Sequence, residues 1–90
     1  MNQAGQFSDI DLLDKLDRLL ESAETELQRT ATMLQIDVNT EQAFEGTLSK
    51  MKEVESVALE LKNEDARIIA SEKILLFSRR FNEVVEQVKN

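Results

Sequence analysis

The apolar residues in the last third of the chain constrain its fold most. Between residues 70 and 88 they recur at alternating spacings of four and three, at Ala70, Ile74, Phe77, Phe81, Val84 and Val88. This alternation places all six on one side of an α-helix of 3.6 residues per turn. Four further residues widen that side to about half of the helix circumference: Ala66, Ile69, Leu76 and Val85. The pattern predicts a helix that buries a broad apolar face against two neighbouring helices.

Two apolar residues of the same segment fall outside this face. Ile68 and Leu75 lie seven residues apart and nearly opposite to the apolar face. Such a pair forms a narrow second apolar stripe that contacts another chain, or consists of single exposed apolar residues, which are common on protein surfaces. Under the first interpretation, Ile68 and Leu75 are candidate residues of a partner interface.

Two more helices are predicted before this one. Ser8 is a favourable N-cap residue, and Asp9 and Asp11 would lie in the first turn that follows it, where the helix dipole favours acidic groups. The first helix, about residues 8–35, has apolar residues and one threonine at helical spacing: Leu13, Leu16, Leu20, Ala23, Leu27, Thr30 and Leu34. The second, about residues 40–62, carries Phe44, Thr47, Met51, Val54, Ala58 and Leu61. Residues 1–7 are predicted to be a disordered tail, and residues 8–90 a single helical domain.

The connection between the second and third helices is the least determined part. Leu61 and Ala70 are nine residues apart, a spacing that no single helical stripe allows, so the apolar face changes direction between residues 62 and 66. Asn63 is suited to ending one helix and capping the next. The sequence therefore predicts an all-α protein, an antiparallel three-helix bundle with helices at about 8–35, 40–62 and 64–89. The alternative is a long helical hairpin in which one continuous helix, residues 40–88, packs on the first helix and oligomerises.

The composition argues against catalysis. The chain has no His and no Cys, so it lacks the commonest general base, the thiol nucleophile and the softest metal ligands. It also lacks a glycine-rich loop that would hold a phosphate group. We expect no enzymatic activity, no cofactor and no bound metal.

Charge restricts the class of partner. The net charge is −7, and residues 1–38 hold eight acidic against three basic residues. An acidic chain disfavours nucleic acid and anionic lipid as ligands, because both require a basic binding surface. No apolar run is long enough to span a membrane, and residues 1–7 do not resemble a secretory leader. We expect a cytoplasmic or nuclear protein without membrane insertion.

Charged residues at the edges of the apolar faces predict how the first and third helices align. In an up-down-up bundle these helices run parallel, which brings Asp17 level with Lys73 and Glu24 level with Arg80. Such flanking charges either pair across a helix interface or remain in water, each on its own helix and without a partner on the other. Asp17 and Glu24 therefore join Ile68 and Leu75 as candidate interface residues.

Two functions fit this description. The first is a non-enzymatic protein–protein interaction module, a small helical subunit or adaptor of a larger coiled-coil or bundle assembly. The alternative is a small acidic helical chaperone or antagonist that masks a helix of a partner protein. In both cases we expect the partner to be another protein with a helical structure, in a homo- or hetero-oligomer. The first function predicts a constitutive complex, and the second predicts exchange of the bound partner.

Overall fold

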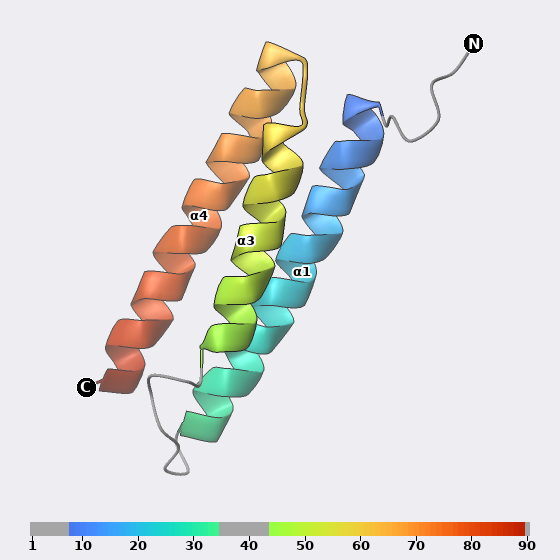
Figure 1. Cartoon of the computed structure of the whole chain (residues 1–90). Coiled ribbons are helices and arrows are strands. Elements are labelled where there is room, and N and C mark those ends of the chain that lie inside the picture. Colours follow the sequence, from blue (N-terminus) through green and yellow to red (C-terminus); the bar gives the residue numbers. More distant parts are fainter. Residues whose placement is uncertain (1–7, 35–43, 90) are drawn as a thin grey trace.

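The part of the chain that the structure describes folds into three α-helices connected in an up-down-up order. The structure, a computed structural model, describes residues 8–34 and 44–89 (Figure 1). Its helices are α1 (Asp9–Leu34), α3 (Glu45–Leu59) and α4 (Glu64–Lys89), and the described residues contain no strand. The prediction of an all-α three-helix bundle is confirmed. The predicted tail, residues 1–7, lies outside the described residues.

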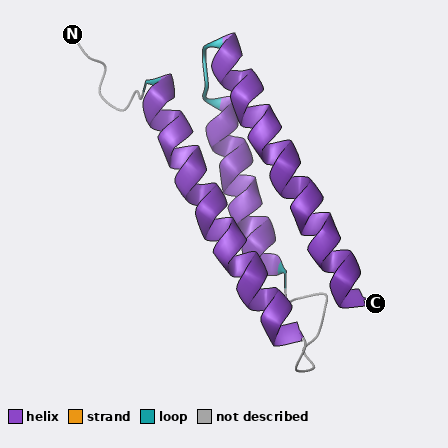
Figure 2. Ribbon diagram, turned by 180° about the vertical axis from the view of Figure 1, so that it is seen from behind, coloured by secondary structure: helices purple, strands orange, loops and turns teal. Residues whose placement is uncertain are grey.

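The three helices lie side by side in an elongated bundle. α1 and α4 run in the same direction and α3 runs opposite to both (Figure 1). Seen from the other side, α3 lies behind and between the two longer helices (Figure 2). α3 packs most extensively against α1 and least against α4. Over the described residues, no helix is both long and apolar enough to cross a membrane.

Side-chain caps fix the starts of the two long helices. The backbone N–H of Asp11 donates to the Ser8 hydroxyl at 3.2 Å, which satisfies one of the free N–H groups in the first turn of α1. Asn63 does the same for α4, because its side-chain oxygen accepts from Asp65 N–H at 2.8 Å and Ala66 N–H at 3.3 Å. Both predicted N-caps are confirmed.

The turn between α3 and α4 separates them into two helices. α3 ends at Leu59, three residues before the predicted end, and the last N–H groups bond tightly, Glu60 to Val57 O at 3.0 Å and Leu61 to Ala58 O at 3.2 Å. Leu61 then enters the core. The alternative of one continuous helix over residues 40–88 is wrong, because burying Leu61 ends α3 and Asn63 starts a new helix.

A buried aromatic residue stands directly before α3. Phe44 precedes the first helical residue, Glu45, and the predicted start at residue 40 lies outside the described residues. Gly46 therefore lies in the first turn. A Cβ atom at Gly46 would lie 2.8 Å from Oε1 of Glu26, so this glycine leaves room for a side chain of α1.

The described residues form a core of two clusters along the bundle axis. The cluster nearest the α3–α4 turn contains Leu12, Leu16, Val54, Val57, Leu61, Ala66 and Ala70. The other cluster contains Ala23, Leu27, Phe44 and Phe77, with Phe81 and Met51 partly buried against it. Burial of these side chains is the main stabilising term of the fold. Most of these residues belong to the helical patterns expected from the sequence.

Candidate protein-interaction surface

Among the described helices, α4 has the largest number of exposed large apolar side chains. Ala70 and Phe77 point into the bundle and are buried. Each is preceded by two exposed aliphatic residues, Ile68 and Ile69 before Ala70, and Leu75 and Leu76 before Phe77. α4 thus exposes apolar side chains along two borders. One border lies beside α1 and the other lies beside α3.

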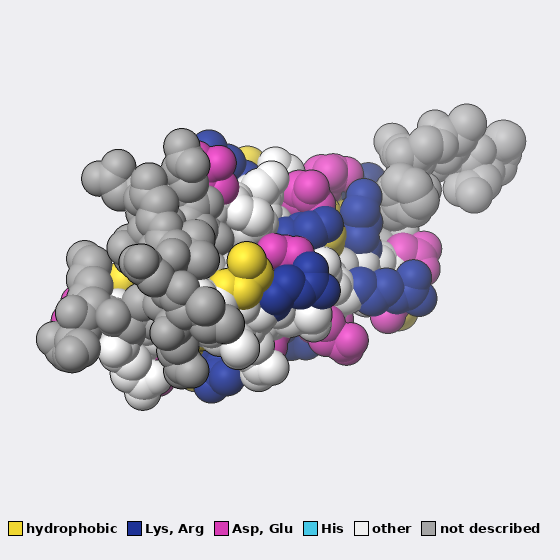
Figure 3. Space-filling model, turned by 90° about the horizontal axis from the view of Figure 1, so that it is seen from below, with side chains coloured by type: hydrophobic (Ala, Val, Ile, Leu, Met, Phe, Trp, Pro, Cys, Tyr) yellow, Lys and Arg dark blue, Asp and Glu magenta, His cyan; other side chains and the backbone are white. Residues whose placement is uncertain are grey.

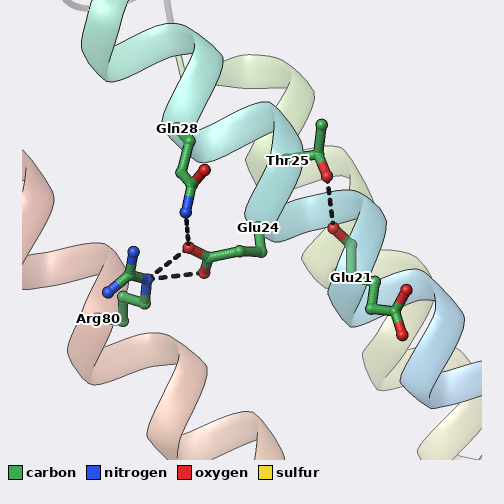
Figure 4. A network of polar contacts seen from close by, with 5 residues as sticks. All are labelled: Glu21, Glu24, Thr25, Gln28 and Arg80. Atoms are coloured by element: carbon green, nitrogen blue, oxygen red, sulfur yellow. Dashed lines mark hydrogen bonds and ion pairs between the residues drawn. The ribbon is translucent and has the colours of Figure 1, made fainter.

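Two ion pairs bridge the border between α4 and α1. Nζ of Lys73 lies 2.5 Å from Oδ1 of Asp17, and Nε of Arg80 lies 2.6 and 2.8 Å from the two carboxylate oxygens of Glu24. Gln28, one turn further along α1, donates to the same Glu24 carboxylate at 2.8 Å (Figure 4). The predicted pairing of Asp17 with Lys73 and of Glu24 with Arg80 is confirmed. Any contact of Asp17 or Glu24 with a partner protein stays a prediction.

Apolar residues at this border are more exposed than the sequence predicted. Ile69 and Leu76 were expected on the buried face, but 43% and 63% of their surfaces are exposed. Leu76 lines a shallow groove together with Asp17 and Glu24. α1 meets this side of α4 with charged side chains, so it pairs with Lys73 and Arg80 and leaves the neighbouring aliphatic residues uncovered.

The border between α4 and α3 has a different character. Within the described part of the chain, no ion pair and no side-chain hydrogen bond links residues of α3 to residues of α4. A groove, called here the α3/α4 groove, runs along it and is lined by Glu55, Ala58, Leu59, Ser71, Ile74, Leu75 and Ser78. Four of these seven side chains are apolar and two are small serines. Such a lining suits an apolar segment that approaches closely.

The two apolar residues predicted to contact a partner, Ile68 and Leu75, lie at this groove or next to it. Leu75 lines the groove, and Ile68 lies two helical turns earlier on the same side of α4. Their exposed fractions are 52% and 51%. Leu59 of α3, at the same groove, is 83% exposed. The structure thus places Ile68 and Leu75 on the surface, away from Asp17 and Glu24, which lie at the border with α1.

Asp9 has a role that the sequence analysis missed. Its carboxylate accepts hydrogen bonds from the backbone N–H groups of Lys62 at 3.0 Å and Asn63 at 2.6 Å, more than fifty residues away. These two bonds hold the pKa of Asp9 below its ordinary value of 3.8, because they stabilise the charged carboxylate. The only sequence signal was an acidic residue directly after an N-cap, which the helix dipole already explained.

The charged surface is mixed. Seen from below, acidic and basic side chains alternate over the described residues, and hydrophobic side chains show between them at only a few places (Figure 3). The described residues contain no group of His, Cys, Asp and Glu that could hold a metal ion. Among the described residues, some polar contacts join two helices, as between Glu24 and Arg80, and others lie within one helix, as between Asp14 and Arg18.

Comparison with known proteins adds no relative. No protein-family model, no curated protein and no solved structure matches the chain. Inference about its function therefore rests on the geometry of the bundle.

Proposed function

We propose that this protein is a non-enzymatic interaction module, a small helical subunit or adaptor that joins a larger helical assembly through α4. The observation that supports the proposal is the exposure of four aliphatic side chains on this one helix: Ile68, Ile69, Leu75 and Leu76. They form two pairs seven residues apart, which is the spacing by which helices pack side by side. Burial of such residues by a further helix would remove apolar surface from water.

The position of these residues supports a helical partner. A helix docking against α4 would meet apolar side chains at every second turn, the i and i+7 spacing that also occurs in helix-in-groove recognition. The α3/α4 groove offers small residues, Ala58, Ser71 and Ser78, on which the backbone of another helix can approach closely. The groove is open to solvent along its length, so such a helix would reach these residues from outside the bundle.

Paired glutamate substitutions test the proposal. The variant Ile68→Glu with Leu75→Glu changes the border beside α3, and Ile69→Glu with Leu76→Glu changes the border beside α1. A matched control is Ser49→Glu with Ser56→Glu, which places two charges seven residues apart at exposed positions of α3. Circular dichroism should show that all three variants keep the helical content of the wild type.

The readout is the size of the complex that the tagged full chain forms in a native cell extract. The wild type and the control should elute with another polypeptide, in a complex larger than a 10.3 kDa chain or a homo-oligomer of it. At least one of the two α4 variants should lose that polypeptide. A wild-type chain that binds no other polypeptide would contradict the proposal.

The stability of that complex distinguishes the subunit from the alternative function. A subunit or adaptor is expected to keep its partner through extended washing, because the interface is part of a permanent assembly. A chaperone or antagonist is expected to exchange the bound protein for a labelled copy of it. Rapid exchange would therefore favour a chaperone.

A further inference from the structure

α4 contains a seven-residue repeat with one informative exception. Residues 68–74 read IIASEKI and residues 75–81 read LLFSRRF. Six of the seven positions hold the same type of residue in both copies of the repeat. The first three are apolar, the fourth is a serine, the sixth is basic and the seventh is apolar. The fifth position differs, because Glu72 is acidic and Arg79 is basic.

The bundle uses only some of these repeated positions. Ala70 and Phe77 are buried in the core, and Lys73 and Arg80 pair with α1. Three of the repeated positions lie on the side of α4 that faces away from α1. They are occupied by Ile68 and Leu75, by Ser71 and Ser78, and by Glu72 and Arg79. We call Ile68, Ser71, Leu75 and Ser78 the outer stripe, which Glu72 and Arg79 flank. Neither flanking residue has an ion-pair partner among the described residues, although their neighbours Lys73 and Arg80 do.

The outer stripe has the pattern of one side of a coiled coil. Its spacings of three, four and three correspond to successive positions a and d of a heptad, and Glu72 and Arg79 then occupy position e. The stripe alternates large and small side chains. In an antiparallel pair of identical helices, Ile68 packs beside Ser78 of the second copy and Ser71 beside Leu75 of the second copy, so large side chains face small ones. In a parallel pair, serines would face serines and leave gaps.

The flanking charges match the same antiparallel register. The side chains of a helix lean toward its N-terminus, so two facing side chains at position e meet when both residues lie somewhat C-terminal to that level. The two residue numbers of such a pair then add up to five more than those of a level pair. With Ile68 level with Ser78 of the second copy, Glu72 meets Arg79 of the second copy, and the two-fold axis repeats the pair. A chain with net charge −7 thus has a local surface that is self-complementary in charge.

We propose that the protein forms a two-fold symmetric dimer in which the outer stripes of two copies pack antiparallel along the α3/α4 grooves. The proposal rests on the proposed function, in that α4 docks a helix, and it identifies one such helix as α4 of a second copy. The exposed Leu59 at the same groove would be covered by that helix. The acidic helix α1 lies on the opposite side of α4, so the dimer keeps the two copies of α1 apart.

Charge reversal on the full chain tests the dimer. Arg79→Glu alone and Glu72→Arg alone each replace two attractive pairs by two repulsive ones, so each should weaken the dimer about tenfold or more in sedimentation equilibrium. The double variant, Glu72→Arg with Arg79→Glu, restores opposite charges and should return the dissociation constant to within about threefold of the wild type. Lys15→Glu on α1 is the matched control, with the same charge change as Arg79→Glu and no expected effect.

Distances between copies test the register. The chain has no Cys, so Glu64→Cys and Asn82→Cys each give a single site for a spin label. Both residues are nine positions from the midpoint of the proposed pairing, so in the dimer each label should lie about 27 Å along the axis from its copy. A parallel dimer would instead place both pairs of labels at short distance.

Three outcomes would overturn the proposal: a purified chain that is monomeric at all concentrations, a double variant as weak as the single ones, or short distances at both labels. These outcomes differ from failure of the proposed function. A monomeric chain that still binds another polypeptide in cell extract would overturn the dimer alone. A dimer that binds no other polypeptide would contradict the proposed function alone.

Discussion

Asp9 connects the start of α1 to the turn between α3 and α4. Its carboxylate accepts from two consecutive backbone N–H groups, those of Lys62 and Asn63, which would otherwise have only water as a partner. Asn63 is also the N-cap of α4, so Asp9 fixes the turn from one side while Asn63 orders the helix on the other. One carboxylate therefore helps to set how all three helices meet at this end of the bundle.

This contact predicts a pH dependence of stability. The pKa of Asp9 is lowered in the folded chain from 3.8, because the hydrogen bonds from Lys62 and Asn63 favour the charged form. Its contribution to the free energy of unfolding is therefore fully present above pH 3.8 and is lost as the pH falls through the lowered pKa. The free-energy difference between the wild type and Asp9→Asn should be constant near neutral pH and shrink in that acidic range.

NMR titration of the Asp9 carboxyl group provides a direct check. The midpoint should lie below 3.8 in the folded protein. Asp11 in the same first turn accepts no hydrogen bond from the α3–α4 turn, so Asp11→Asn is a suitable control for the stability measurement. A free-energy difference for Asp9→Asn that is independent of pH would mean that the bonds to the turn are absent in solution.

Thr47 is a second residue whose polar atom matters. Its side chain is fully buried in α3, and the hydroxyl oxygen has no hydrogen-bond partner among the described residues. Thr47→Val replaces that hydroxyl by a methyl group of similar size. We expect the free energy of unfolding in urea to rise by up to about 1 kcal/mol, because the cost of burying an unpaired hydroxyl is removed.

A second buried threonine among the described residues provides the comparison for this substitution. Thr30 of α1 has an interaction partner, so Thr30→Val should bring no gain and is expected to destabilise the chain. If Thr47→Val were clearly destabilising, the Thr47 hydroxyl would have a partner in solution.

At the scale of the helices, charged pairs align α1 and α4 more than they stabilise them. The Glu24 and Arg80 side chains are 29% and 50% exposed, so water screens their attraction. A double-mutant cycle with Glu24→Gln and Arg80→Gln should give a coupling of about 0.2–1 kcal/mol. The coupling should decrease with added salt, because an exposed pair is screened.

A local pair serves as the reference for this cycle. Asp14 and Arg18 lie 2.9 Å apart on the same helix, so their coupling does not depend on how α1 and α4 pack. The coupling of Asp14 with Arg18 should persist in conditions in which α1 stays helical but no longer packs on α4. In the same conditions the coupling of Glu24 with Arg80 should vanish. A zero coupling for Glu24 and Arg80 in the folded chain would argue against the parallel alignment of α1 and α4.

Across the whole molecule, the aromatic cluster holds the three helices together at the end away from the α3–α4 turn. Phe77 is buried in this cluster, whereas Phe81 is only partly buried and forms a T-shaped pair with the Phe44 ring at a centroid distance of 5.4 Å. Phe77→Ala should lower the free energy of unfolding by about 3 kcal/mol or more, because it leaves a cavity in the core. Phe81→Ala should cost less, because part of that ring is already in water.

Urea denaturation of the two variants measures this difference. Leu76→Ala is a control on the same helix, since that side chain is largely exposed and should change stability only slightly. A change of less than about 0.5 kcal/mol for Phe77→Ala would show that the cluster is open in the isolated chain.

Three features could be predicted from the amino-acid sequence: the helices, the side of each helix that carries most of its buried residues, and the level alignment of charged residues on α1 and α4. These features depend on regular periodicity and on level alignment, so residues such as Ala70, Phe77, Asp17 and Lys73 could be assigned from spacing alone. Ser8 and Asn63 were identifiable because capping is a local interaction.

The exposed apolar residues and the contacts between distant residues depend instead on how the three helices pack. Periodicity gives the width of an apolar face, but the number of neighbouring helices decides how much of it is covered, which is why Ile69 and Leu76 are exposed. The bonds from Lys62 and Asn63 to Asp9 link residues more than fifty positions apart, and no local pattern specifies such a contact. The end of α3 at Leu59 was decided in the same way, because Leu61 is buried only once α1 and α4 are in place.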